Sequence, residues 1–107
     1  MAYSITIKYG NVLSEEADFI VNASNTKLLL GSGVSLAFKR HCGIKLQKEM
    51  NDIIKNINGF LQQGDVVLTS SADAKNFTYC LHAVIIDYNI DIRQNNKKPS
   101  LNTRLLA

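Results

Sequence analysis

Cysteine is scarce in this sequence, and long apolar runs are absent. The two cysteines, Cys42 and Cys80, belong neither to a CxxC pair nor to a cluster of metal ligands. We therefore expect two buried thiols in a reducing compartment, with no bound metal and no other cofactor. No apolar run approaches the roughly 20 residues that cross a bilayer, and no signal sequence precedes Ile5. These absences favour a cytoplasmic protein that does not enter a membrane.

Strong charge of either sign is also lacking. The 12 Lys and Arg residues exceed the 9 Asp and Glu residues by three, and basic side chains adjoin only in small groups such as Lys39-Arg40 and Lys97-Lys98. This pattern does not indicate a nucleic-acid groove. A composition of 46% hydrophobic and 20% charged residues is that of a folded globular protein. The 107 residues predict a single domain over 1–107, which is short for a three-layer α/β fold.

Four segments have the apolar pattern of β-strands, namely 4–9, 19–21, 65–69 and 77–86. The first alternates apolar and polar side chains, which is typical of a strand with one buried face. The second has no polar alternation, which predicts a strand covered on both faces inside an α/β sheet.

Helical spacing of apolar residues is found in two segments. One helix is predicted over 34–42, ended by Gly43, and a longer one over 46–57. Residues 87–98 have no clear period and predict a loop. A further helix is expected to begin at Pro99, because proline is favoured in the first helical turn.

The most informative stretch is the strand at 19–21, followed by two asparagines at 22 and 25 and the loop Gly31-Ser-Gly-Val34. This order predicts a strand, a loop and a helix, with glycines at the start of the helix. The first N–H groups of a helix have no intrahelical partner and lie at the positive end of its dipole, so they bind an anion without a basic side chain. The loop therefore predicts a phosphate site. Gly-Ser-Gly is also a common flexible connector, and asparagines also fix turns locally.

Taken together, these motifs resemble the signature of the macro domain family, whose members bind ADP-ribose. The signature is Ile-Val-Asn-Ala-Ser-Asn at 20–25, then Gly-Ser-Gly-Val at 31–34 and Ala-Phe-Lys-Arg-His-Cys-Gly at 37–43. The resemblance continues through 63–69 and 80–84, so it covers nearly the whole chain. It implies a three-layer α/β/α fold with a mixed sheet.

The resemblance also implies ligand contacts. Asn11 and Val12 would lie at the adenine, and Asn22 and Asn25 would lie near the distal ribose. The pyrophosphate would be surrounded by Gly31, Ser32, Gly33 and Val34. The residues themselves support only the pyrophosphate assignment. At position 11 the family usually has an aspartate, and an asparagine oxygen accepts the same hydrogen bond without the charge. An ordinary turn asparagine is an equally open interpretation of this position.

Three functions stay open at this level. The first, which we favour, is binding of ADP-ribose or of an ADP-ribosylated protein. The second is hydrolysis, for which Asn25 and Ser35 are the nearest catalytic candidates. Many hydrolytic relatives have an aspartate where this chain has Ser35. The serine hydroxyl cannot replace that carboxylate as a base. The third is a structural or interaction subunit that has lost its ligand.

Neither histidine belongs to a recognisable catalytic triad, because no aspartate and serine are placed to complete one. His82 lies within an apolar strand and is expected to be a hydrogen-bonded core residue. His41 lies beside two basic residues on the first predicted helix and is expected to be exposed.

A complete macro domain has two further strands and a second glycine-rich loop. In the family's sheet those strands lie between the strands expected here at 4–9 and 19–21, so the first strand would lack a neighbour for its backbone groups. We expect an incomplete or shortened domain, unless the first strand has moved beside the second or a partner chain completes the sheet. Such a domain would be weakly stable and would self-associate through unpaired strand edges.

Overall fold

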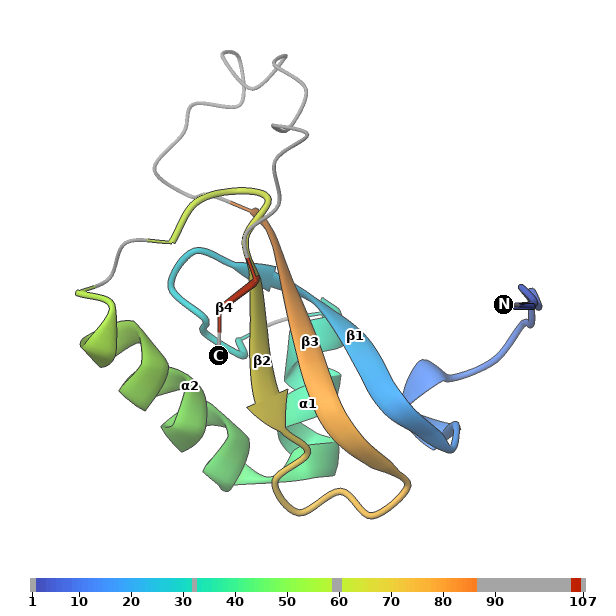
Figure 1. Ribbon diagram of the computed structural model, residues 1–107. Helices are drawn as coiled ribbons and strands as arrows, with labels where there is room; N and C mark the ends of the chain where they lie inside the picture. Colours follow the sequence, from blue (N-terminus) through green and yellow to red (C-terminus); the bar gives the residue numbers. More distant parts are fainter. Residues whose placement is uncertain (1, 32, 59–60, 87–104, 107) are drawn as a thin grey trace.

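The computed structural model describes residues 2–31, 33–58, 61–86 and 105–106. Figure 1 shows its elements, which in chain order are the 3₁₀ turn η1 (Val12–Ser14), β1 (Ala17–Asn25), α1 (Gly33–Cys42), α2 (Ile44–Asn56), β2 (Val66–Ser70), β3 (Phe77–Ile86) and β4 (Leu105–Leu106).

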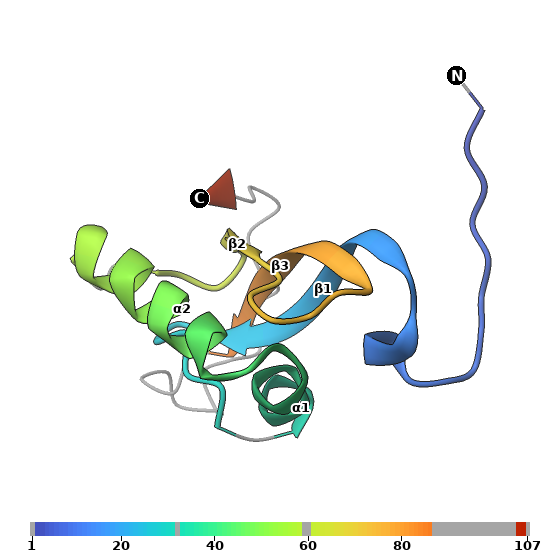
Figure 2. The same cartoon turned by 90° about the horizontal axis from the view of Figure 1, so that it is seen from below.

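The four strands form one mixed sheet in the order β1-β3-β2-β4. β1 and β3 are parallel, β2 and β3 are antiparallel, and β2 and β4 are parallel. Both helices lie on the same face of this sheet, as Figure 2 shows. The predicted α/β class with a mixed sheet is thus confirmed. The two described helices form a single layer on one face of the sheet.

The hydrophobic core lies between the two helices and the face of the sheet that they cover. α1 contributes Phe38 and Cys42, α2 contributes Leu46 and Met50, and all four side chains are fully buried. The strand residues that pack against them from the covered face are Ile20, Val67, Cys80 and Val84. Burying an apolar side chain of this size stabilises the fold by about 1.5–3 kcal/mol, so this layer supplies the main favourable term.

The two cysteines are buried free thiols, as expected. A hydrogen bond between them lowers the pKa of Cys42. The same hydrogen bond, together with burial, raises the pKa of Cys80 well above its usual range. Cys80 therefore stays a neutral thiol and packs as a small apolar residue.

A chain of buried hydrogen bonds crosses the three central strands. The His82 side chain is fully buried, and its Nδ1 accepts from Asn22 Nδ2 at 3.0 Å. Its Nε2 lies 2.8 Å from Thr69 Oγ1, which itself donates to the Ser70 carbonyl oxygen at 2.9 Å. This pattern of donors and acceptors fits a neutral imidazole with its proton on Nε2. The predicted hydrogen-bonded core histidine is confirmed.

β1 is longer than the strand predicted at 19–21, and it continues through both asparagines. Its side chains alternate, so Phe19 and Val21 are half exposed on the open face while Asn22 is buried on the covered face. It is therefore not covered on both faces within the described structure. The asparagine does not end the strand, because it is in register with His82 on β3 and its amide finds a partner there.

The strand predicted at 4–9 is not formed. These residues are exposed, with Ile5 84% and Ile7 94% accessible, and they run away from the sheet in both views (Figures 1 and 2). The alternation of side chains suits a strand, but a strand also needs a neighbour for its N–H and C=O groups. The sheet of the described residues contains no such pairing for this segment.

The two predicted helices are confirmed, and Gly43 separates them as expected. Its φ is +82°, and a Cβ at this position would lie 2.7 Å from the Asp73 carboxylate. Its N–H donates to the Lys39 carbonyl oxygen at 2.9 Å, so it ends α1 and also precedes α2. No helix in the described part of the chain is long and apolar enough to cross a membrane.

The helix predicted from Pro99 onward is wrong where it can be compared, because Leu105–Leu106 form the short strand β4 beside β2. The position of Pro99 and the loop predicted at 87–98 lie outside the described residues. The sequence pattern at 105–106 did not reveal that β2 offers backbone groups for pairing on its edge opposite β3.

Acid should destabilise this fold through His82. Burial lowers the pKa of His82 from 6.5 to about 4, against a smaller opposing effect of Glu49. The unfolded chain therefore takes up this proton at a higher pH than the folded one. The contribution is fully present above about pH 6.5 and is lost as the pH falls toward about 4, by on the order of 3 kcal/mol.

Thermal melting between about pH 7 and pH 4 measures this loss of stability. Because carboxylates also titrate in this range, an NMR titration of the His82 ring in the folded protein is the deciding measurement. A ring that gains its proton near pH 6.5 would contradict the prediction.

Candidate functional site

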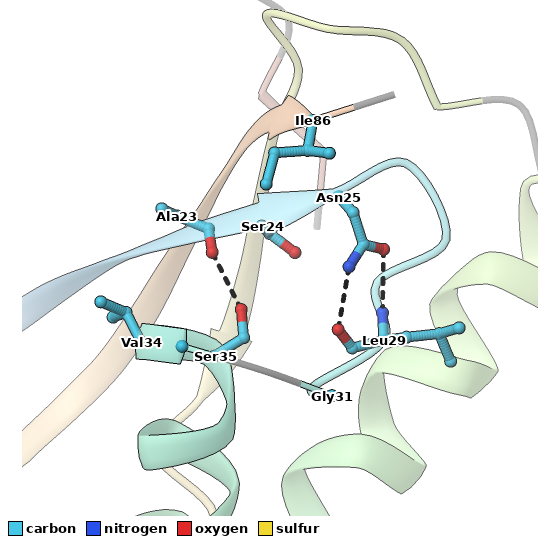
Figure 3. Close-up of a pocket in the computed structure, with 9 residues that line it drawn as sticks. Ala23, Ser24, Asn25, Leu29, Gly31, Val34, Ser35 and Ile86 are labelled. Carbon is cyan, nitrogen blue, oxygen red and sulfur yellow. Dashed lines mark hydrogen bonds between the residues drawn. The ribbon is translucent and has the colours of Figure 1, made fainter. Parts of the chain in front are cut away.

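A hollow of about 470 Å³ lies at the carboxyl end of β1, between that strand and the start of α1 (Figure 3). Its lining is Ala23, Ser24, Asn25, Leu29, Gly31, Gly33, Val34, Ser35 and Ile86. In α/β sheets, ligands bind beyond the carboxyl ends of the strands. The volume falls within the range of about 300–1,000 Å³ that is usual for small-molecule sites. The hollow is therefore the leading candidate site.

A β-bulge at the end of β1 shapes the wall of this hollow. The register with β3 shifts there, so that Ser24 pairs with Val84 but Asn25 pairs with Ile86. Consecutive residues of a regular strand face opposite sides of the sheet, yet Ser24 and Asn25 are both buried. The irregularity thus brings two neighbouring polar side chains to the hollow, as bulges near binding sites commonly do.

The Asn25 side chain holds the loop that follows β1. Its Oδ1 accepts hydrogen bonds from the N–H groups of Lys27 and Leu29, at 3.0 and 3.1 Å. Its Nδ2 donates to the Leu29 carbonyl oxygen at 2.9 Å (Figure 3). Within this loop Leu28 has a φ of +52°, a strained value that is tolerated because its side chain is fully buried.

Gln47 of α2 holds the same loop from the other side. Its Oε1 accepts from the Leu30 N–H at 2.7 Å, and its Nε2 donates to the Leu28 carbonyl oxygen at 2.8 Å. Sequence reasoning missed this residue, because the helical pattern identifies apolar positions and a polar neighbour of the stripe has no signal of its own. The loop is thus fixed by two amide side chains that are distant in sequence.

The start of α1 lies directly at the hollow. Gly33 has a φ of +56°, and nothing lies within 4 Å of the position where a Cβ would stand. The first turn of α1 contains no acidic side chain, so no carboxylate of that turn offsets the positive end of the helix dipole. The backbone around Gly33 is therefore accessible and electrostatically suited to an anion.

The Ser35 hydroxyl joins α1 to β1. It donates to the Ala23 carbonyl oxygen at 2.9 Å (Figure 3), and it lies 3.3 Å from Asn22 Oδ1. The residue is buried, so the hydrogen bond is protected from water. Its proton is already used to hold the helix against the strand, and this gives Ser35 a structural role.

The structure brings together part of the predicted ligand site. Asn25, Gly31, Gly33 and Val34 all line the hollow, whereas Ser32 lies outside the described residues. The Asn22 side chain does not line it, because it is fully buried and hydrogen-bonded to the core histidine.

Asn11 and Val12 do not line this hollow either. The Asn11 Oδ1 accepts a hydrogen bond from the Leu13 N–H at 3.0 Å and caps η1, which agrees with the turn interpretation. Both residues border a separate hollow near Lys8 and Glu15. Within the described ranges, no group of three or more His, Cys, Asp or Glu side chains is arranged to hold a metal ion.

Sequence reasoning also missed Ser24 and Ile86 as lining residues. Ser24 lies between two asparagines and follows Asn22 by two positions, which places both on one face of the strand. Its contact with the hollow depends on how α1 and the loop before it pack beside the end of β1, which no local pattern reveals.

The family model of the macro domain matches residues 21–105, so the chain belongs to the macro domain family. A macro domain-containing protein of Listeria monocytogenes is 44% identical over 80 residues, which are 75% of this chain and 44% of that protein. A protein of Sulfolobus acidocaldarius is 36% identical over 87 residues, 81% of this chain and 47% of that protein. The chain thus spans less than half the length of these curated relatives.

Solved structures agree with this assignment. The Oceanobacillus iheyensis macrodomain with ADP is 34% identical, with a TM-score of 0.66 over 70% of this chain and 40% of that chain. A variant of the same macrodomain with ADP-ribose matches with the same identity and TM-score, over 70% of this chain and 41% of that chain. The described strands and helices therefore form part of a macro domain fold.

Removing the Asn25 side chain should destabilise the protein. Asn25→Ala leaves two N–H groups and one carbonyl oxygen without their partner, so we expect the free energy of unfolding to fall by about 2–3 kcal/mol. Asn25→Asp keeps the acceptor for both N–H groups but not the donor to Leu29, and its loss should be smaller. Urea unfolding measures both changes.

The exposed Asn56, at the end of α2, provides a matched control. Asn56→Ala should change the unfolding free energy by less than about 0.5 kcal/mol. Equal effects of Asn25→Ala and Asn56→Ala would show that Asn25 does not hold the loop.

Proposed function

We propose that this chain is a binding module for ADP-ribose or an ADP-ribose derivative, including an ADP-ribosylated protein. The observation that carries the proposal is the hollow in which the carboxyl end of β1 meets the glycine-rich start of α1. The pyrophosphate would lie against the backbone amides of Gly31, Ser32, Gly33 and Val34. Macrodomain relatives solved with ADP and with ADP-ribose support the same ligand class.

The other proposed contacts follow from the family resemblance and differ in geometric support. Asn25 is near the proposed distal ribose, but both ends of its amide hold the loop. The side chain of Asn22 is buried, so Asn22 would contribute only indirectly, by its contact with the Ser35 hydroxyl at the start of α1. Asn11 and Val12 remain the proposed adenine contacts, with the Asn11 oxygen already engaged by a backbone N–H.

Binding is favoured over hydrolysis by the side chains of the hollow. Its lining contains no carboxylate, histidine, cysteine or lysine among the described residues. The nearest catalytic candidates are Asn25 and Ser35, and both side chains are committed to hydrogen bonds that hold the fold. A general base must be free to accept a proton, so we expect little or no release of ADP-ribose from a modified protein.

Gly33→Val should weaken ADP-ribose binding by at least about tenfold, because its side chain would occupy the space beside the amides and would strain a left-handed backbone. Gly31→Val tests the same wall without that strain, since Gly31 has no left-handed φ and open space around its Cβ position. Asn56→Ala, at the exposed end of α2 and outside both hollows, is the control. Isothermal titration calorimetry measures affinity, and circular dichroism confirms folding.

Unchanged affinity in folded Gly33→Val and Gly31→Val variants would overturn the pyrophosphate assignment. A loss of affinity of the same size in Asn56→Ala would show that the effect is not local to the hollow.

We propose in addition that a second copy of the chain associates with the open face and free edge of this sheet. Within the described sheet, β1 pairs only with β3, so its other edge carries unpaired N–H and C=O groups. The uncovered face beside it is apolar, with Phe19 50% and Val21 57% accessible, and the Phe19 ring stacks on Tyr79 with centroids 5.2 Å apart. Such edges and patches promote association.

The occupant that fits this edge is the extended segment 4–9 of the second copy. It alternates apolar and polar side chains, and Ile5 and Ile7 are exposed in the single chain. A strand added to β1 would satisfy its backbone groups and place one row of side chains on the apolar face. Lys8 has only an exposed contact with Glu15 at 3.5 Å, which holds the segment weakly in its present place.

Sedimentation over a range of concentrations should show reversible self-association, and the melting temperature should rise with concentration. Val21→Lys, on the open face, should shift the protein toward monomer. Ile44→Lys is the matched control, because Ile44 is exposed on a helix that covers the opposite face. A monomer with a concentration-independent transition would contradict this proposal.

A further inference from the structure

The Ser24 hydroxyl is buried and has no hydrogen-bond partner. Among the described residues it is the single buried side-chain nitrogen or oxygen in this condition, and the residue is 1% exposed. Nearly all buried polar groups in proteins are hydrogen-bonded, because leaving one unpaired costs its desolvation free energy. An alanine at this position would avoid that cost, so the hydroxyl calls for a physical explanation.

Its position supplies one. Ser24 lines the hollow at the bulge of β1, and Figure 3 shows its oxygen pointing into the space between Ser35 and Asn25. The hydroxyl of Ser35 already donates to Ala23, and the Asn25 amide is engaged at both ends. Of the polar side chains described in this wall, only that of Ser24 makes no hydrogen bond at all.

The surroundings favour a negatively charged acceptor. The start of α1 forms the facing wall, its first turn has no acidic side chain, and the described lining of the hollow includes no carboxylate. An anionic oxygen in this space would meet the positive end of the helix dipole on one side and a hydroxyl donor on the other. A hydrogen bond to a charged acceptor is among the stronger ones in proteins.

We infer that Ser24 is a ligand-positioning residue, whose Oγ donates a hydrogen bond to an oxygen of the ligand's distal phosphate. This inference rests on the proposed function, since it assumes a diphosphate in the hollow. The hydroxyl is unpaired in the free protein and becomes satisfied when the diphosphate enters. The cost of its burial in the free protein is thereby recovered on binding.

Ser24→Ala separates this role from mere packing. We expect the ligand-free variant to melt at the same temperature as the natural protein or higher, because an unpaired buried hydroxyl has been removed. Calorimetry should show affinities for ADP-ribose and ADP that are lower by about tenfold, and an affinity for AMP that is unchanged. AMP lacks the distal phosphate and serves as the ligand control.

Ser71→Ala is the matched protein control. Its buried Oγ donates to the Ala74 carbonyl oxygen at 3.0 Å, and Ser71 does not line the hollow. This variant should lose thermal stability and keep its affinity, which is the opposite of the result expected for Ser24→Ala.

Equal affinities of Ser24→Ala and the natural protein for ADP-ribose and ADP would overturn the inference while leaving the proposed function in place. A loss seen with ADP-ribose but not with ADP would also overturn it, because the acceptor would then belong to the ribose. Failure of the natural protein to bind either ligand would overturn both the proposed function and this inference.

Discussion

The structure depends on a neutral histidine that three strands share. His82 on β3 connects Asn22 on β1 with Thr69 on β2 through two buried hydrogen bonds. A slip of one residue in either pairing would place the imidazole and its partner on opposite faces of the sheet and leave both unsatisfied. The hydrogen bonds therefore specify the register as well as stabilise it. In a protonated imidazole both ring nitrogens carry a hydrogen, so Nδ1 could not accept the hydrogen bond from Asn22. The fold therefore requires the neutral form of His82.

The candidate site is built on the continuation of this arrangement. Asn22 also faces the Ser35 hydroxyl, which holds the start of α1 against the strand. Two residues farther along β1, Ser24 reaches the hollow with its donor unused, and Asn25 next to it fixes the loop. The polar side chains at the end of one strand are thus divided between holding the backbone of the site and, as we propose, contacting the ligand. Rigid support of a binding loop lowers the entropic cost of binding.

The two faces of the sheet differ in how far the described residues cover them. Helices α1 and α2 cover one face and bury a dense core there, whereas Phe19 and Val21 on the other face are half exposed. The chain spans less than half the length of the macro domain proteins that it matches. The described residues hold the part of the fold that contains the glycine-rich loop, and an apolar surface of this kind favours association.

Local patterns in the sequence were sufficient for the elements whose physics is local. The apolar stripes determined both helices, Gly43 determined their separation, and the glycines after β1 determined an accessible backbone at a helix start. The family resemblance added the ligand class that we propose. It did not show that Asn22 faces the core, because that depends on the register with His82.

Only the tertiary structure decided which polar groups are satisfied. The segment 4–9 alternates like a strand but is not paired in the sheet of the described residues, because strand formation needs a neighbour that local sequence does not specify. The role of Gln47 in the loop depends on packing between α2 and that loop, and the role of Ser24 in the hollow depends on the position of α1 beside the end of β1. Side-chain identity determines what a residue can donate or accept, whereas the long-range pairing of strands and helices determines whether a partner is there.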